Sequence, residues 1–161
     1  NQLLMEMTNY YQKDPTRIQH FLKVHQFSKW IGQEEHLDDK TQRILEIAAI
    51  VHDIGILPAE QKFGRCDGSL QEQEGPPIAR EMLQKLGFQQ EIVERVCFLV
   101  GHHHTYTNIK GLDYQILVEA DFLVNLYEDH SSEQGILSAY QKIFRTQTGK
   151  QICSTMFGIK L

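Results

Sequence analysis

The chain has 161 residues, the usual length of one domain, and 41% of them are hydrophobic and 23% charged, which excludes wholesale disorder. Sixteen Lys and Arg against 21 Asp and Glu give a net charge of −5, and this acidic balance argues against binding to nucleic acid polymers. No segment reaches the ~18–20 apolar residues that a bilayer span requires, so we expect no membrane association through a spanning helix.

The cysteines and the N-terminal segment indicate a cytoplasmic protein. The chain has three cysteines, Cys66, Cys97 and Cys153, and no two of them form a CxxC pair. An odd number of widely separated cysteines predicts neither a disulfide framework nor a zinc knuckle. The first residues, NQLLMEMTNYYQ, have no basic region followed by a long apolar run, so they do not resemble a signal peptide.

Helical periodicity begins at Asp14-Pro15, a pair typical of an N-cap followed by the first helical position. Apolar residues then recur at helical spacing as far as Ile31, which predicts a helix that ends near Gly32. Asp38-Asp39 predicts the start of a second helix, and Gly55 and Pro58 predict its end. Residues 58–75 are polar and rich in glycine, which predicts a loop longer than the ~12–15 residues usual in compact domains.

Further helices are predicted for residues 76–86, 89–101, 113–128 and 132–145. The segment HHHTYTNIKG is a predicted polar turn, and the tail from residue 146 has little helical signal. No run shows the alternation of a strand. We therefore expect residues 1–161 to form an all-α single domain, a compact helical bundle of roughly seven helices.

Four polar residues stand in apolar helical segments. His52 and Asp53 lie in ILEIAAIVHDIGIL, Asp121 lies in LVEADFLVNL, and His20 lies on the first long helix. A buried carboxylate must be paired, hydrogen-bonded or bound to a metal. Imidazole and carboxylate together suit divalent transition metals, which lower the pKa of bound water. Taken singly, a buried His is more often a hydrogen-bonded core histidine than a ligand, and a buried Asp is often a helix cap or an ion-pair partner.

The order of these residues resembles the HD-domain superfamily of metal-dependent phosphohydrolases. AAIVHDIG is similar to the central motif of that superfamily, RIQHFLKV to its first-helix His, and EADFLVN to its closing Asp segment. The resemblance covers about residues 15–128, which leaves residues 129–161 as a C-terminal helix and tail. It implies a helical bundle with a metal at its centre.

By this resemblance, His20, His52, Asp53 and Asp121 would be the metal ligands. The metal would be Mn, Fe, Ni, Co, Zn or Mg, with one ion expected and two as the alternative. The implied reaction is hydrolysis of a small phosphate ester, a nucleotide or a related phosphomonoester or diester, by metal-bound water.

The chain also departs from particular branches of the superfamily. Some members carry Glu three residues after the Asp of the central motif, where this chain has Ile56, and the Gly-Tyr-Pro signature of cyclic di-GMP hydrolases is absent. The substrates of those branches are therefore not expected here.

Some members bind a second metal through extra histidines, with the residue matching Asp53 as the bridge. His102 and His103 match the later of these positions, whereas the earlier one falls in QEQEGPPIAR, where Glu74 is the alternative ligand or general base. Asp53, Glu74, His102 and His103 are thus the candidate catalytic residues. Three exposed histidines at a helix end can instead simply interact with the helix dipole.

A phosphate substrate needs cationic or hydrogen-bonding partners. The candidates are Arg17, one turn before His20, Lys62 and Arg65 in the 58–75 loop, and His104. The loop itself is a candidate lid. Two other functions are kept open: a non-catalytic ligand-sensing domain of the same fold, and a dinuclear-iron oxidative enzyme. The expected partner is a small phosphorylated molecule, and a homo-oligomer is left open.

Overall fold

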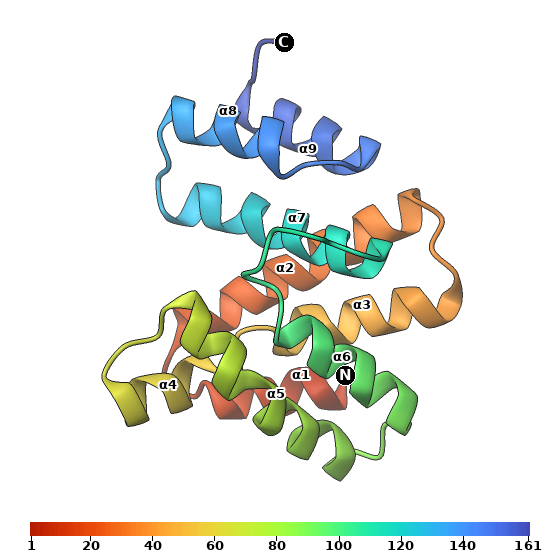
Figure 1. The fold of residues 1–161 in the computed structure, drawn as a ribbon, viewed down its shortest axis with the longest axis vertical. Helices are drawn as coiled ribbons and strands as arrows, with labels where there is room; N and C mark the ends of the chain where they lie inside the picture. Colours follow the sequence, from red (N-terminus) through yellow and green to blue (C-terminus); the bar gives the residue numbers. More distant parts are fainter.

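The computed structural model describes all 161 residues and contains nine helices and no strand. Figure 1 shows them in order: α1 (Gln2–Tyr10), α2 (Pro15–Glu34), α3 (Asp39–Val51), α4 (Ile56–Phe63), α5 (Gly68–Lys85), α6 (Gln90–Val100), α7 (Leu112–Glu128), α8 (Glu133–Lys142) and α9 (Gln147–Phe157). The prediction of an all-α fold is confirmed, with two helices more than expected. No helix has both the length and the apolar character needed to cross a membrane.

The two predicted helix starts in the first third of the chain are confirmed by their caps. The Asp14 carboxylate accepts a hydrogen bond from the backbone N–H of Arg17 at 3.2 Å, and Pro15 is the first helical residue. The Asp38 carboxylate accepts from the N–H of Thr41 at 2.7 Å. Each bond satisfies a backbone donor that has no partner within the helix.

The predicted loop over residues 58–75 is wrong. Most of it is helical, because α4 and α5 occupy it and only a short turn separates them. Pro58 lies in the first turn of α4, where its missing N–H needs no partner. Asp67 caps α5 by accepting from the N–H of Leu70 at 3.2 Å. Of the residues that suggested a loop, Pro58, Gly64 and Gly68 are thus helix-terminus residues.

Helix α5 also runs through Gly75, Pro76 and Pro77, where the sequence predicted a new helix start. Gly75 lies so close to α6 that a Cβ atom there would stand 2.7 Å from Cγ1 of Val100. Packing against α6 therefore outweighs the poor helix propensity of these residues.

Helices α1 and α9 have no counterpart in the sequence prediction. Each is short, and each is stabilised by burial: α1 buries Leu3 and Met7, and α9 buries Ile152 and Cys153. Short helices have little intrinsic stability in water, so tertiary packing decides whether they form.

One continuous hydrophobic cluster joins residues from Leu3 to Cys153. Figure 1 shows α2, α3 and α7 in the middle of the molecule, α8 and α9 at the end that holds the C-terminus, and α4 and α5 toward the opposite end. Because α2 packs against both α3 and α7, polar residues on these three helices are brought together in the interior.

Candidate metal centre

The four predicted metal ligands come from three segments that meet in this interior. His20 lies in the second turn of α2, Asp121 lies in the middle of α7, and His52 and Asp53 begin the turn that joins α3 to α4. That turn is pressed against α5 at Gly55, where a Cβ atom would lie 2.5 Å from the carbonyl oxygen of Gln71. Glycine at this position thus allows the turn to reach the core.

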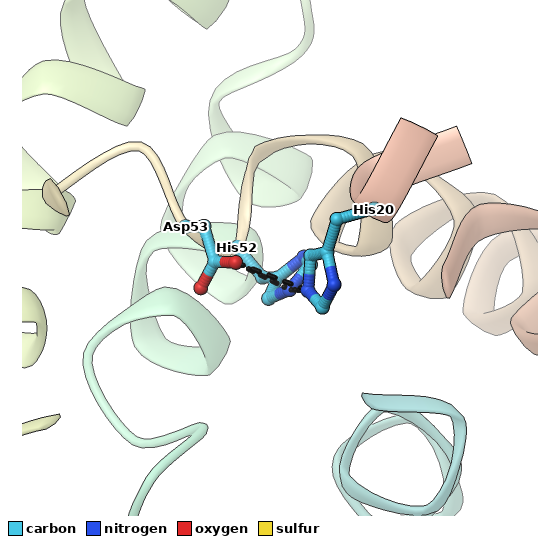
Figure 2. A group of neighbouring side chains, drawn as sticks. All are labelled: His20, His52 and Asp53. Atoms are coloured by element: carbon cyan, nitrogen blue, oxygen red, sulfur yellow. Dashed lines mark hydrogen bonds and ion pairs between the residues drawn. The ribbon is translucent and has the colours of Figure 1, made fainter. Parts of the chain in front are cut away.

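The ligand atoms of the four side chains converge. His20 Nε2 lies 3.1 Å from Asp53 Oδ2, 3.2 Å from Asp121 Oδ1 and 3.3 Å from His52 Nε2. His52 Nε2 lies 3.3 Å from Asp53 Oδ2 and 3.4 Å from Asp121 Oδ1. Figure 2 shows the rings of His20 and His52 and the carboxylate of Asp53 turned toward one another. We call this group the ligand cluster.

Hydrogen bonds outside the ligand cluster set the tautomer of each ring. His52 Nδ1 donates to the carbonyl of Ala49 at 2.7 Å, and His20 Nδ1 donates to the carboxylate of Glu128 at 2.7 Å. Each Nδ1 therefore carries a proton, which leaves Nε2 as the atom of each ring that faces the carboxylates and that could bind a metal. This is the arrangement of metal-binding histidines, whose second nitrogen bonds to a carbonyl or carboxylate.

His103 shares this orientation. Its Nδ1 donates to the carbonyl of Val100 at 2.8 Å, and its Nε2 lies 3.4 Å from Asp53 Oδ1. The side chain is buried, and Nε2 has no hydrogen-bond partner. An unpaired buried nitrogen is costly, which indicates that a partner is meant to occupy the space in front of it.

The pKa values show how strongly the ligand cluster attracts positive charge. Burial lowers the pKa of His20, but its bonds to Asp121 and Asp53 outweigh burial and raise the pKa from 6.5 to about 11. Burial also lowers the pKa of His52, yet the charges of Asp53 and Asp121 raise it to about 10. Burial raises the pKa of Asp53, but the neighbouring histidines hold it well below its usual range.

A divalent metal fits these residues. The ligand cluster has a buried carboxylate, Asp121, and a partly buried one, Asp53, both faced by imidazole nitrogens. It therefore needs a cation, either protons on the rings or a metal ion. His20, His52 and Asp53 have one ligand atom each within 4.8 Å of the others. Mixed nitrogen and oxygen donors favour Mn, Fe, Co, Ni or Zn over Mg.

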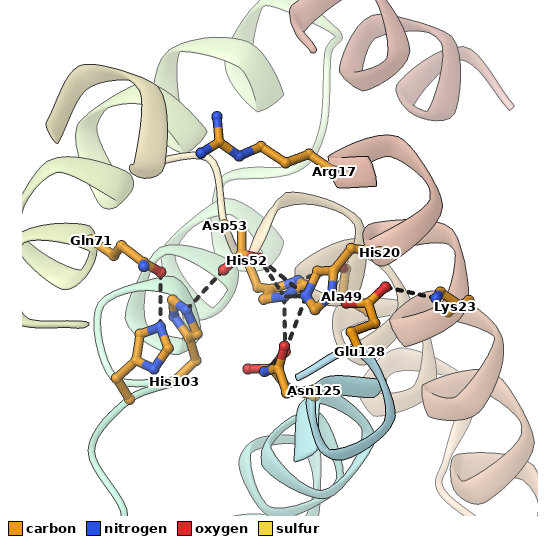
Figure 3. Close-up of polar contacts among 12 residues, drawn as sticks. Arg17, His20, Lys23, Ala49, His52, Asp53, Gln71, His103, Asn125 and Glu128 are labelled. Atoms are coloured by element: carbon orange, nitrogen blue, oxygen red, sulfur yellow. Dashed lines mark hydrogen bonds and ion pairs between the residues drawn. The ribbon is translucent and has the colours of Figure 1, made fainter. Parts of the chain in front are cut away.

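Several residues that the sequence did not indicate hold the ligands in place. Asn125 donates from Nδ2 to Asp121 Oδ1 at 3.0 Å, and Figure 3 shows it beneath the two histidines. The hydroxyl of Tyr11 donates to the carbonyl of Asp53 at 2.7 Å. The spacing of Asp121, Asn125 and Glu128, at i, i+4 and i+7 on one helix face, could have indicated two of these residues.

The histidine triplet divides into three different environments. His103 faces the ligand cluster, and Asp53, His103 and His104 form a second group of close ligand atoms. His104 Nε2, however, is within 2.8 Å of Gln71 Oε1, an acceptor. His102 lies outside both groups, because its ring stacks on Phe98 at 4.0 Å and its Nδ1 donates to the Phe98 carbonyl.

The other candidate residues are paired with one another or with neighbours. Glu74 is bonded to Lys62 at 2.6 Å, which lowers the pKa of its carboxyl, and it belongs to neither ligand group. Arg17 lies 3.1 Å from Glu60, and Figure 3 shows it near Asp53 but turned away from the ligand cluster. Arg65 pairs with Asp67 at 3.1 Å on an exposed turn.

An apolar groove of the molecule lies elsewhere. It has a volume of about 470 Å³ between α2 and α9, and it is lined by Phe27, Trp30 and Met156 among others, without any predicted ligand. The groove therefore adds nothing to the ligand cluster.

Comparisons with known proteins agree with this geometry. A family model described as "HD domain" matches residues 17–140. A crystal structure of a predicted HD superfamily hydrolase from an uncultured Thermotogales bacterium is 24% identical, with a TM-score of 0.70 over 98% of this chain and 84% of that one. At 24% identity, the similarity to this crystal structure shows that the two chains share a fold. None of the curated proteins is similar enough in sequence to match the chain.

Proposed function

The chain belongs to the HD domain family, and we propose that it is a metal-dependent phosphohydrolase that cleaves a small phosphate ester, a nucleotide or a related phosphomonoester or diester. One observation carries the proposal: the Nε2 atoms of His20 and His52 lie 3.1–3.4 Å from carboxylate oxygens of the partly buried Asp53 and the buried Asp121. The description of the similar crystal structure as a hydrolase supports the same class of reaction.

The residues of the ligand cluster have separate roles in this proposal. His20, His52, Asp53 and Asp121 hold a divalent metal, which when bound polarises a phosphoryl oxygen and lowers the pKa of water. His103 exchanges a proton at Nε2, since this atom is buried, unpaired and 3.4 Å from Asp53 Oδ1. The hydrogen bond from His103 Nδ1 to the carbonyl of Val100 keeps Nε2 oriented toward the ligand cluster.

Substrate recognition falls to Arg17 among the candidate cations. Arg17 is the best placed, one helical turn before His20, but its guanidinium is shared between Glu60 and Asp14. A phosphate would bind the Arg17 guanidinium in place of the Glu60 carboxylate. The Glu60 side chain is 42% exposed, so it can rotate into the solvent when the ion pair is broken. The contacts of Glu74, His102, Lys62 and Arg65 do not favour a role for these side chains.

A centre with two metals is the second candidate, favoured by the group of Asp53, His103 and His104. Gln71 opposes it, because its Oε1 engages His104 Nε2 while its Nε2 donates to the carbonyl of Cys66 at 2.6 Å. Both ends of the Gln71 amide are therefore in use, and we expect one metal per chain.

The test is metal content by elemental mass spectrometry on untagged protein, together with a screen of phosphate release from nucleotides and simple phosphate esters. Asp53→Ala should lose both the metal and the hydrolysis, whereas Asp129→Ala, a change at an exposed aspartate that follows α7, should keep both. A wild-type protein that cannot bind Mn, Fe, Co, Ni or Zn would refute the proposal. Two bound irons would instead favour the dinuclear centre and oxidative chemistry.

A further inference from the structure

Glu128, the last residue of α7, contacts the back of the His20 ring, away from the ligand cluster. Its Oε1 accepts from His20 Nδ1 at 2.7 Å, and its Oε2 accepts from Lys23 Nζ at 2.6 Å. We infer that Glu128, held in place by Lys23, is the positioning residue that keeps His20 oriented as a metal ligand. This inference rests on the proposed function, because it concerns the same metal centre.

His20 needs such a partner because of its place in the fold. His52 comes directly after α3, and His103 is the third residue after α6, so each uses a carbonyl near the end of its helix, Ala49 or Val100. His20 lies within α2, beyond its first turn and far from its C-terminal end, where the carbonyls are bonded along the helix. Its Nδ1 proton therefore requires an acceptor from another helix, and Glu128 on α7 supplies it.

The two helices are matched at this point. His20 and Lys23 are three residues apart on α2, and Asp121 and Glu128 are seven residues apart on α7, so each pair lies on one helix face. Asp121 approaches His20 at Nε2 and Glu128 approaches it at Nδ1. Figure 3 shows Glu128 between the His20 ring and Lys23.

Both oxygens of the Glu128 carboxylate are in use, so its orientation is defined by two contacts rather than one. The Glu128 side chain is 22% exposed and that of Lys23 is 41% exposed. A partly covered carboxylate with a fixed plane holds a ring more firmly than a mobile surface group does. Partners of this kind affect metal affinity by about 10- to 100-fold when they are removed.

The chain offers a matched control on the same helix. His25 Nε2 lies 3.5 Å from Glu46 Oε1, which makes a second His–Glu pair between α2 and a neighbouring helix. This pair lies outside the ligand cluster. Removal of Glu46 therefore reports what the loss of any such pair does to the protein.

The experiment is a titration of the full chain with Co²⁺, followed by calorimetry and by the visible spectrum of the bound ion. Glu128→Ala should weaken Co²⁺ binding about 10- to 100-fold and change the spectrum. Glu128→Gln keeps an acceptor oxygen for Nδ1 and should recover most of the affinity. Lys23→Met, which leaves every ligand and its acceptor in place, should weaken binding less than Glu128→Ala does.

Glu46→Ala should bind Co²⁺ as the wild type does. Unfolding in urea without metal shows whether each variant folds. If Glu128→Ala does not fold, the Co²⁺ affinities of Glu128→Gln and Lys23→Met are compared with that of the wild type instead. Wild-type affinity in Glu128→Ala, or an equal loss in Glu46→Ala, would overturn the inference alone. A wild-type protein that binds no Co²⁺, Mn²⁺ or Zn²⁺ would overturn the proposed function and this inference with it.

Discussion

Removal of one hydroxyl, in Tyr11→Phe, tests whether the N-terminal helix supports the ligand cluster. The Tyr11 hydroxyl donates to the carbonyl of Asp53 at 2.7 Å, and the residue is only 2% exposed. Burial raises the pKa of this hydroxyl well above 10, so it remains a donor. Phe fills the same space, which confines the change to the loss of one hydrogen bond.

The expected cost is small and can be worked out. The Asp53 carbonyl also accepts from the N–H of Ile56 at 3.0 Å, so the variant leaves no buried carbonyl without a partner. One net hydrogen bond contributes about 0.5–1.5 kcal/mol to the free energy of unfolding. For a chain of this length, that corresponds to a fall in Tm of about 1–6 °C.

The metal centre should respond as well, because the Tyr11 hydroxyl helps to hold the turn that carries Asp53. Thermal unfolding and Co²⁺ titration are compared for the wild type, Tyr11→Phe and Tyr127→Phe, the last at a tyrosine that is 67% exposed. Tyr11→Phe alone should lower both Tm and affinity. An unchanged Tm and Co²⁺ affinity in Tyr11→Phe, or the same change in Tyr127→Phe, would refute the reasoning. Helix α1 would then only bury apolar residues of the core.

Three further predictions concern stability. Gly149→Ala should lower the free energy of unfolding by roughly 2–4 kcal/mol in urea titrations, because its Cβ would stand 1.9 Å from Oε1 of the buried Glu119. Glu119→Gln should cost less than Glu119→Ala, since the amide keeps an oxygen for the N–H of Thr146, which the carboxylate accepts at 3.0 Å; equal costs would show that the carboxylate is not the anchor of α9. Burial lowers the pKa of His104 from 6.5 to about 4. When the pH is lowered from about 6.5 to 4, the unfolded chain therefore binds a proton that the folded chain does not, and the free energy of unfolding falls. His104→Gln should lose less stability than the wild type between pH 7 and 5, and equal losses would contradict the assignment.

The ion-pair partners of the charged residues expected to bind a substrate could not be predicted from the sequence. Arg17, Lys62 and Arg65 are each engaged by a carboxylate, from Glu60, Glu74 and Asp67 respectively. Two of these partners lie on another helix, so no pattern along the chain could have indicated them.

Local physical chemistry is enough to identify the helical class and to single out four polar residues, while it was the resemblance to the HD-domain superfamily that implied that the four meet. Caps such as Asp14 and Asp38 act within one turn, so they can be read directly from neighbouring residues. His20, His52, Asp53 and Asp121 stand out because a polar group in an apolar helix needs a partner. That requirement holds whatever the partner is, and the structure brings these four together.

The short helices, the residues that hold the ligands and the direction of each histidine depend on contacts between distant segments. Helices α1 and α9 form because they bury Met7 and Cys153, and neither gain exists until the rest of the chain has folded. His102 and His103 are neighbours in the chain, yet one stacks on Phe98 and the other faces Asp53. Successive residues of a helical turn point about 100° apart, so only the placement of the surrounding helices determines which one reaches the ligand cluster.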